Sequence, residues 1–455
     1  MPTKPTNHFI MLGRAVSYWN LHRFPLLMVL FALLFYWVTG YALERDDTIR
    51  FFCLYGALFF FCFKLIQFEK WNFRFLLVSG ILFRLVLLFA MPNLSQDFYR
   101  FLWDGHLVLD GINPYLSKPN DLISGLGTDP YFAALHTGMG ELSAGNFSNY
   151  PPLNQVFFSL AALLGGKSIL GGILTLRFII ITADLGIIYV GRLLLKKMNR
   201  SAHLIFWYFL NPLVILELTG NLHFEGVMLF FMVAALYLLI SKRTLLASLA
   251  YGASVVVKLI PLMLLPLFFT ALGLRKSLLF YVGTGLAVVL SFLYFYTPDF
   301  LPNYLATLHL WFSNFEFNAG IYNGIKQIAI QFDAKPWELI RWYGNLIPYA
   351  TVALVLFYTF YKRDSSLPHL INSMMWVMVI YYLLAPVVHP WYLIVPLLLS
   401  LFTPYRFPIV WSVVAILSYT AYANPGYKES MLAISIEYFA VLAMMGYELF
   451  RKRRG

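Results

Sequence analysis

Residues 24–43, FPLLMVLFALLFYWVTGYAL, carry no charged side chain and decide the class of this protein. A membrane-spanning helix needs about 20 mostly apolar residues, and this stretch supplies them without a break. It is too long for the apolar core of a signal peptide and lacks a small-residue cleavage site, so we interpret it as a retained first helix. Of the 455 residues in the chain, 60% are hydrophobic and only 12% are charged, which excludes an ordinary soluble domain.

Comparable apolar stretches recur along the chain and predict an all-α, polytopic membrane protein with about 13–14 transmembrane helices. We treat residues 1–455 as a single integral membrane domain, in which residues 1–74 contribute the first two helices. After the span at 24–43, further spans are expected near 51–68, 75–92, 173–195, 203–219, 226–241, 244–260, 262–273, 278–297, 346–361, 367–385, 390–403, 407–423 and 431–450.

The formal net charge of +12 follows this topology. Lys and Arg gather in alternate connections between spans, as the positive-inside rule expects for cytoplasmic segments. The clearest examples are Lys196, Lys197, Arg200, Lys242, Arg243, Arg275 and Lys276. The pattern predicts a multi-pass protein of the cell (inner) membrane with both termini in the cytoplasm. Because the charge orients the protein, nucleic acid is not an expected partner.

Two long connections, residues 93–172 and 298–345, fall on the outer side in this topology. The first contains a short apolar piece, residues 153–166, which we expect to form an interfacial or re-entrant helix. The second is rich in aromatic residues, among them Tyr322, Trp337 and Trp342, and should lie on the membrane surface. Function should be sought in these connections.

The densest polar sequence lies in the first connection, at residues 95–115. If residues 96–110 are helical, Asp97, Arg100 and Asp104 share one face. One interpretation is a surface helix with exposed ion pairs that contribute under about 1 kcal/mol. The other is that one carboxylate acts as a general base, held by Arg100 and the second carboxylate at the edge of a cavity of low dielectric.

The second interpretation is favoured because four more polar clusters fall on the same outer side, where unpaired ionisable groups are costly and usually functional. They are Tyr150–Gln155, Asn221–Glu225 with Glu217 just before it, Lys258–Pro261 and His389–Tyr392. Within the spans, Arg177 and Asp184 lie seven residues apart on one helical face. We expect Asp184 to form a structural buried pair with Arg177 or with Arg84.

The motif formed by Asp97, Tyr99, Arg100, Trp103, Asp104 and Gly105, followed by Gly111, Asn113, Pro114 and Tyr115, resembles the polytopic GT-C glycosyltransferases. The resemblance is closest to bacterial mannosyltransferases that use a polyprenyl-phosphate sugar, and it extends through the other four clusters. Two features depart from that family. The loop follows the third span rather than the first, and Gln96 stands where many relatives have a second acidic residue.

The resemblance implies interfacial helices in residues 93–172, with Asp97 as the catalytic base and Asp104 as the second candidate. It implies transfer of a sugar, with mannose expected, from a polyprenyl-phosphate donor to a glycan, glycolipid or protein acceptor at the outer face of the membrane, with inversion. The lipid phosphate would meet Lys258, Arg100 or His389. Neither a metal nor a cofactor is expected. The substrate-binding candidates are Tyr99, Arg100, His106, Asn113, Tyr115, Tyr150, Gln155, Asn221, His223, Glu225, Lys258, His389, Trp391 and Tyr392.

Two other functions remain open from the residues alone. A transporter or flippase of a lipid-linked or polar substrate would also carry polar groups at membrane depth, although it should place them near the midplane and show repeats or broken helices. A ligase that uses a pyrophosphate-linked glycan would have similar outer clusters but would release a lipid diphosphate.

Overall fold

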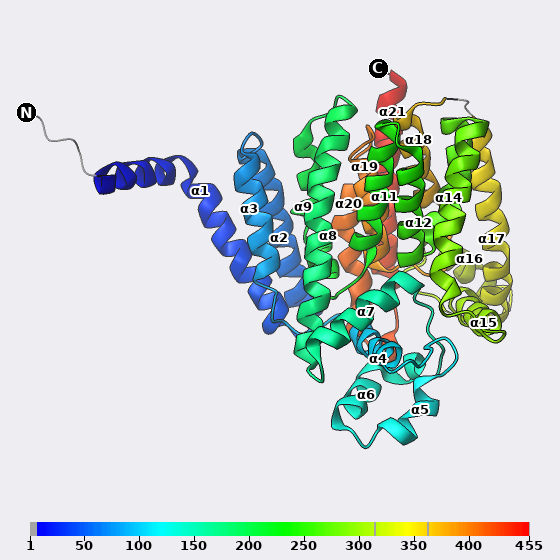
Figure 1. Ribbon diagram of the computed structural model, residues 1–455. Coiled ribbons are helices and arrows are strands. Elements are labelled where there is room, and N and C mark those ends of the chain that lie inside the picture. The colour runs from blue at the N-terminus through cyan, green and yellow to red at the C-terminus, as the bar shows by residue number, and fades with distance from the viewer. Residues whose placement is uncertain (1–6, 314, 362–363, 455) are drawn as a thin grey trace, which may run out of the picture.

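The computed structural model describes residues 7–313, 315–361 and 364–454. These residues form helices and short helical turns, and the one β-type contact among them is an isolated parallel bridge between Phe317 and Val387. The all-α, polytopic class predicted from the apolar stretches is therefore confirmed. Figure 1 shows the long helices side by side in a bundle, with a group of shorter helices at one end.

Seven helices in the described residues are long and apolar enough to cross a membrane. They coincide with predicted spans because each carries an uninterrupted apolar stretch. They are α1 (Asn7–Tyr41), α2 (Thr48–Phe68), α8 (Ile169–Lys197), α14 (Leu274–Leu293), α17 (Pro336–Phe360), α18 (Leu367–Leu384) and α21 (Met431–Arg454).

An eighth span is broken in the middle. The turn η1 (Ala202–Ile205) and α9 (Phe206–Phe209) meet α10 (Pro212–Val214) and η2 (Ile215–Gly220) at a bend of 52°. Pro212 follows the bend, and a proline disfavours helical geometry at the residue before it. The predicted span at 203–219 is thus present as a bent pair.

The remaining predicted spans are shorter helices than the sequence suggested, so fewer than 13–14 full-length spans are seen in the described residues. Prolines inside or at the start of several of these segments limit the regular helix. These elements are α3 (Phe73–Leu85), α11 (Glu225–Ile240), α12 (Thr244–Val257), η3 (Ile260–Leu267) with α13 (Phe268–Leu272), η4 (Pro390–Leu393) with α19 (Ile394–Ser400), and α20 (Phe407–Val414) with η5 (Ala415–Ala423) and η6 (Pro425–Tyr427).

The connection predicted at 298–345 is itself mostly helical. It contains α15 (Phe300–Ser313) and α16 (Gly320–Ile330), and α17 already begins at Pro336, ahead of the apolar stretch at 346–361. The first turns of α17 include Glu338 and Arg341, so hydropathy alone locates only the apolar part of this helix.

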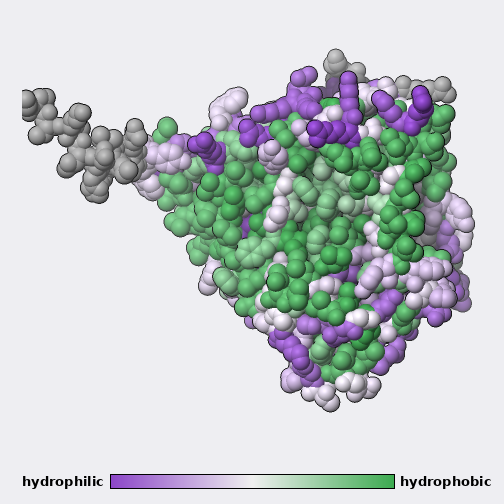
Figure 2. Space-filling model, in the orientation of Figure 1, coloured by the Kyte–Doolittle hydropathy of each residue, from purple (hydrophilic) through white to green (hydrophobic). Residues whose placement is uncertain are grey.

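The connection at 93–172 forms α4 (Asp97–Leu109), α5 (Pro119–Leu126), α6 (Pro130–Ala144) and α7 (Pro152–Gly165). Figure 1 shows these four helices at the end of the bundle opposite the C-terminus, with α7 lying across the ends of the long helices. Figure 2 shows a broad apolar belt across the visible face, with hydrophilic residues along the edge that carries the C-terminus and again around the α4–α7 end.

A buried ion pair lies inside the bundle. Asp184 accepts hydrogen bonds from Arg84 Nε at 2.8 Å and from the Tyr208 hydroxyl at 2.6 Å, so Arg84 is the partner that the sequence left open. Arg177 instead donates to the backbone carbonyls of Thr219, Leu88 and Gly220. Both arginines are fully buried, and these contacts satisfy most of their donors.

Candidate functional site

Helix α4 carries the central motif, and its position depends on a close contact with α7. A side-chain Cβ at Gly105 would lie 2.2 Å from the backbone oxygen of Phe158, so only glycine allows this approach. Phe101, one turn earlier, stacks on Phe158 with ring centroids 4.4 Å apart and an interplanar angle of 8°. The packing fixes the orientation of α4 and leaves Asp97 at its N-terminal end.

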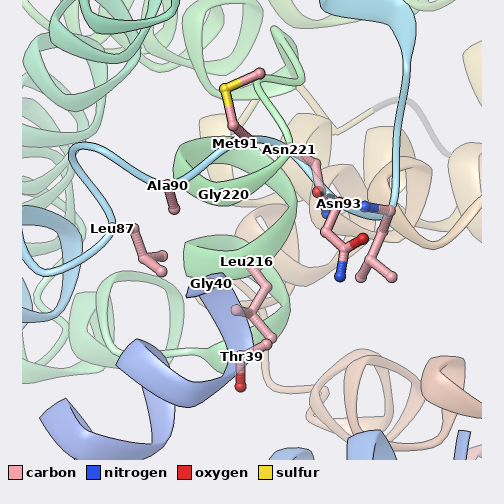
Figure 3. A pocket seen from close by; sticks show the side chains of 10 residues that line it. Thr39, Gly40, Leu87, Ala90, Met91, Asn93, Leu216, Gly220 and Asn221 are labelled. Carbon is pink, nitrogen blue, oxygen red and sulfur yellow. Dashed lines mark hydrogen bonds between the residues drawn. The ribbon is translucent and has the colours of Figure 1, made fainter. Parts of the chain in front are cut away.

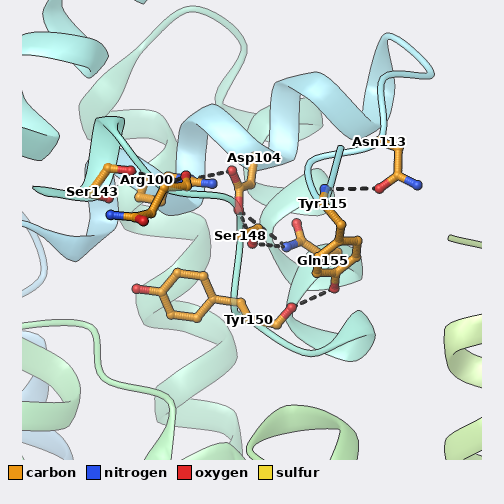
Figure 4. A network of polar contacts seen from close by, with 9 residues as sticks. Arg100, Asp104, Asn113, Tyr115, Ser143, Ser148, Tyr150 and Gln155 are labelled. Atoms are coloured by element: carbon orange, nitrogen blue, oxygen red, sulfur yellow. Dashed lines mark hydrogen bonds and ion pairs between the residues drawn. The ribbon is translucent and has the colours of Figure 1, made fainter. Parts of the chain in front are cut away.

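Asp104 lies at the centre of a buried polar network (Figure 4). Its Oδ1 accepts a hydrogen bond from Arg100 Nε at 2.6 Å, and its Oδ2 accepts from Ser148 Oγ at 2.6 Å and Gln155 Nε2 at 3.3 Å. Arg100 also donates to the carbonyls of Ser143 and Asn146. Both oxygens of Asp104 are therefore occupied, and the network ties α4 to the end of α6 and to α7.

Four other predicted residues of this connection also make structural contacts. The Tyr115 hydroxyl donates to the carbonyl of Tyr150 at 2.6 Å, and Asn113 accepts from the Tyr115 backbone at 3.0 Å while donating to Phe295. His106 lies 3.2 Å from the Tyr131 hydroxyl on α6, and Tyr99 packs against Gly138 of the same helix.

Asp97 differs from Asp104 in its hydrogen bonding and in its exposure. Among the residues that the structure describes, none donates a hydrogen bond to its carboxylate, and the side chain is only partly exposed. Burial raises the pKa of Asp97 to about 6; Lys258 and Arg45 act against this rise and Glu225 adds to it. A carboxylate with free oxygens and a pKa near neutrality has the properties of a general base.

Lys258 and Glu225 form an ion pair beside Asp97. Lys258 caps the C-terminal end of α12 in extended backbone geometry, and its Nζ bonds Oε1 of Glu225 at the start of α11. Asn154 of α7 donates to the carbonyl of Val257 at 2.6 Å, which fixes the residue before Lys258. The second oxygen of Glu225 has no partner although it is buried, and it remains available to a ligand.

Four stacked rings join three segments that are far apart in the sequence. His223 stacks on Trp391 at 3.7 Å, Trp391 on His389 at 4.4 Å, and His389 on Phe317 at 4.8 Å. Burial lowers the pKa of His389 to about 3 and that of His223 well below its usual value. Both imidazoles are therefore neutral at physiological pH.

Residues from each of the other predicted outer clusters interact with Asp97 or with its neighbours. Lys258, Glu225, Tyr150 and Tyr392 interact electrostatically with Asp97. Asn221 donates to the carboxylate of Glu217 at 3.3 Å. The candidates therefore fall into two groups. The residues linked to Asp97 directly or through these neighbours are Tyr150, Asn221, His223, Glu225, Lys258, His389, Trp391 and Tyr392. The residues whose contacts hold the connection together are Tyr99, Arg100, Asp104, His106, Asn113, Tyr115 and Gln155.

Three residues that interact with Asp97 or with the stacked rings were not among the predicted site residues. Arg45 comes from the connection between α1 and α2, Tyr422 from η5 and Phe317 from the segment before α16. The only sequence signal for Arg45 is a lone arginine in an outer connection. Tyr422 and Phe317 have no local signal, because aromatic residues are abundant throughout this chain.

Within the ranges that the structure describes, no three His, Cys, Asp or Glu side chains lie close enough together to hold a metal ion.

Comparisons with known proteins agree with the motif. Residues 47–273 match a family described as alpha-(1->6)-mannopyranosyltransferase, N-terminal domain. The chain is 29% identical over 156 residues to alpha-(1->6)-mannopyranosyltransferase B of Corynebacterium glutamicum, covering 33% of this chain and 24% of that protein. It is 23% identical over 177 residues to alpha-(1->6)-mannopyranosyltransferase A of Mycobacterium tuberculosis, covering 38% and 32%.

The chain therefore spans between about a quarter and a third of the length of these relatives. No solved structure matches it. The family match confirms the resemblance to polytopic mannosyltransferases that the motifs around Asp97 indicated.

Proposed function

From the premise that the chain is similar to the alpha-(1->6)-mannopyranosyltransferases, we propose that it is a multi-pass membrane mannosyltransferase. Its donor is mannose carried on a polyprenyl phosphate, and its acceptor is a hydroxyl of a glycan, glycolipid or protein at the outer face of the membrane. The observation that carries this proposal is the environment of Asp97, whose carboxylate accepts no hydrogen bond from the described residues and has a pKa of about 6 beside Lys258 and Glu225.

Asp97 acts as the general base. It removes the proton of the acceptor hydroxyl while that oxygen forms a bond to the anomeric carbon of mannose. The bond between the anomeric carbon and the phosphate oxygen breaks on the opposite side, which inverts the anomeric configuration. The proton ends on Asp97 and the electron pair on the departing polyprenyl phosphate.

The departing phosphate needs a positive charge nearby, and Lys258 supplies it. Arg100 is committed to Asp104 and to two backbone carbonyls, and His389 is neutral because burial lowers its pKa to about 3. Lys258 is the one of the three predicted candidates that is charged, partly exposed and next to Asp97.

The mannose hydroxyls would meet Glu225 and the stacked rings. The free oxygen of Glu225 can accept a hydrogen bond from a hydroxyl, and Trp391 offers an apolar surface beside it. Asp104 is left with a positioning role in α4, because its oxygens already accept three hydrogen bonds.

The sidedness follows from the distribution of charge. Lys197 at the end of α8 and the basic pair Lys242 and Arg243 after α11 lie in connections that the positive-inside rule assigns to the cytoplasm. Helices α4–α7 lie at the other end of the bundle (Figure 1), which supports an outer location for Asp97, the first residue of α4.

The test is transfer of labelled mannose from polyprenyl-phosphate mannose by the purified protein, comparing wild type with Asp97→Asn. Loss of a general base should lower transfer by at least about 100-fold. Asp110→Asn is the matched control, because Asp110 caps the same helix but is exposed; it should transfer at the wild-type rate.

Transfer by Asp97→Asn at the wild-type rate would refute the base assignment. Release of a lipid diphosphate in place of a monophosphate would identify a ligase. If wild type transfers nothing but moves a lipid-linked substrate between leaflets, the protein is a transporter.

A further inference from the structure

The connection between α1 and α2 delivers a cation to the edge of the Asp97 site. The guanidinium of Arg45 lies over the ring of Tyr422, 4.0 Å from its centroid, and 5.7 Å from that of Tyr427. The side chain is partly buried and its Nε has no hydrogen-bond partner. Arg45 takes part in none of the ion pairs found among the described residues.

Tyr422 holds the guanidinium of Arg45 in place, and no carboxylate among the described residues lies within ion-pair distance of it, so it can still bind an anion. The charge of Arg45 acts on the carboxylate of Asp97, so the two groups belong to one electrostatic neighbourhood. Arg45 itself lies outside the matched region, which begins at residue 47.

A pocket opens between the end of α1, the segment after α3 and η2 (Figure 3). Its walls are mostly apolar and include Leu87, Ala90, Leu216 and Gly220. Asn93 and Leu94, which also line the pocket, connect it to the hairpin that carries Arg45.

Hydrogen bonds between side chains and the backbone link the pocket to the segments that carry Arg45 and Asp97. Asn93 donates to the carbonyl of Leu43, two residues before Arg45. Leu94 donates to the side chain of Asn221 at 3.2 Å and accepts from the Tyr422 hydroxyl at 3.5 Å. The segment Asn93–Leu94 therefore contacts both the pocket and the ring that carries Arg45, and it leads directly to Asp97.

We propose that Arg45 and this pocket form a binding site for the lipid carrier, with the phosphate against the guanidinium of Arg45 and the first isoprenoid unit in the pocket. A guanidinium binds phosphate oxygens through paired hydrogen bonds, and Tyr422 beneath it limits the freedom of the side chain. The apolar walls suit a branched hydrocarbon. The identity of the lipid as a polyprenyl phosphate rests on the proposed function.

The site gives the α1–α2 hairpin a part in substrate binding. Lys258 and Arg45 would both face the phosphate, one from the end of α12 and the other from the hairpin. Lys258 is paired with Glu225, whereas Arg45 has no carboxylate partner among the described residues, so Arg45 should contribute more to holding the lipid than to the bond-breaking step.

The experiment measures binding, without transfer. Radiolabelled farnesyl phosphate is titrated into the full-length protein in nanodiscs, for wild type, Arg45→Ala, Arg45→Lys and Arg50→Ala. Arg50 is the matched control, because it is an exposed arginine of the same hairpin that donates to the carbonyl of Ala42. Arg45→Ala should bind about tenfold more weakly, which corresponds to about 1.4 kcal/mol, Arg45→Lys should fall between, and Arg50→Ala should match wild type.

A second variant tests the pocket. A Cβ at Gly220 meets no atom closer than 3.9 Å, so Gly220→Leu can be accommodated locally while its side chain fills the pocket. It should weaken binding of farnesyl phosphate while Arg45 is unchanged. Unlabelled farnesol, inorganic phosphate and phosphatidylglycerol serve as competitors, and each should compete far less well than farnesyl phosphate.

Equal affinities of Arg45→Ala and Arg50→Ala would overturn the phosphate site, and unchanged binding by Gly220→Leu would overturn the pocket. Equal competition by phosphatidylglycerol would reveal a general phospholipid site, and equal competition by inorganic phosphate would remove the lipid from the proposal. If wild type binds farnesyl phosphate in an Arg45-dependent way but transfers no mannose, the proposed function fails while this site stands.

Discussion

Two aspartates on one helix show how environment divides roles between identical side chains. Asp97 and Asp104 both belong to α4, and the helical spacing puts them on the same face. Asp104 is enclosed by three hydrogen-bond donors, which leave no oxygen for a substrate. Asp97 accepts from no donor among the described residues, and burial raises its pKa.

The raised pKa of Asp97 predicts the pH profile of the enzyme. The base must be deprotonated, so kcat/KM should fall as pH drops through about 6, with a slope of one proton. Lys258 lowers this pKa, so Lys258→Ala should move the acid limb to higher pH, whatever its effect on the maximal rate. Lys118→Ala, in the connection that also contains Asp97, is the control and should leave the midpoint of the pH profile in place. A Lys258→Ala profile with the wild-type midpoint would contradict the assigned electrostatics.

Asp104 should matter for stability. Asp104→Ala leaves the buried guanidinium of Arg100 without its carboxylate, and breaking a buried pair in this way costs about 3–5 kcal/mol. We expect a lower unfolding temperature for the purified variant in detergent, measured beside Asp121→Ala, which removes an exposed aspartate of α5. Equal unfolding temperatures for the two variants would show that the network does not hold the connection together.

At the scale of elements, the site depends on how closely α4 approaches α7. Gly105 and Phe158 bring the two helices into backbone contact, and Gly172 lets Leu102 of α4 pack against α8. These contacts fix the helix that carries Asp97, so a shift of α4 would also move the Asp97 carboxylate. Preorganisation of this kind is what an enzyme needs from its scaffold.

Gly105→Ala tests this dependence. The new Cβ would lie 2.2 Å from the Phe158 oxygen, so α4 and α7 must move apart, and such overpacking typically costs about 1–3 kcal/mol. Transfer of mannose should fall more than the amount of folded protein does, because Asp97 moves with α4. Gly285→Ala in α14 is the control, since a Cβ there meets no atom within 4 Å. The proposed coupling is wrong if both variants transfer mannose at the same rate per folded molecule.

The sequence predicts elements well where the signal is local. The boundaries of α4, expected at 96–110, are found at Asp97–Leu109, because the signal is the helical spacing of the residues themselves. Partners that come from far along the chain carry no such signal. Ser148 and Gln155 lie 44 and 51 residues from Asp104, and Arg84 lies 100 residues from Asp184.

For the same reason the sequence alone does not distinguish an available carboxylate from an occupied one. The resemblance makes Arg100 a candidate for the lipid phosphate, and its shared face with the two aspartates makes it a candidate partner of a carboxylate; in the structure it bonds Asp104 and two carbonyls at the end of α6. The number of full-length spans was overestimated for a similar reason. Hydropathy counts apolar residues through Pro266, whereas the residues around it form η3, a 3₁₀ helix of eight residues.

At the scale of the whole molecule, the apolar belt on the face shown in Figure 2 lies between two hydrophilic edges, and helices α4–α7 lie at one of these edges. Under the proposed function, a lipid-linked donor would enter from the belt and an acceptor from water. Asp97 at the start of α4 and Lys258 at the end of α12 would then serve both substrates, because the proposed site lies between the belt and the α4–α7 helices.

The orientation across the membrane is the last prediction. In a variant with Cys53 and Cys62 replaced by Ala, Ser124→Cys places a single thiol on an exposed position of α5, and Lys242→Cys places one in the connection after α11. A membrane-impermeant maleimide applied to intact cells should label Cys at 124 but not at 242, and both after lysis, because the Lys- and Arg-rich connections stay in the cytoplasm. The reverse pattern would put Asp97 in the cytoplasm. The donor would then have to present its mannose on that side, so the labelling decides which leaflet supplies the substrate as well as the topology.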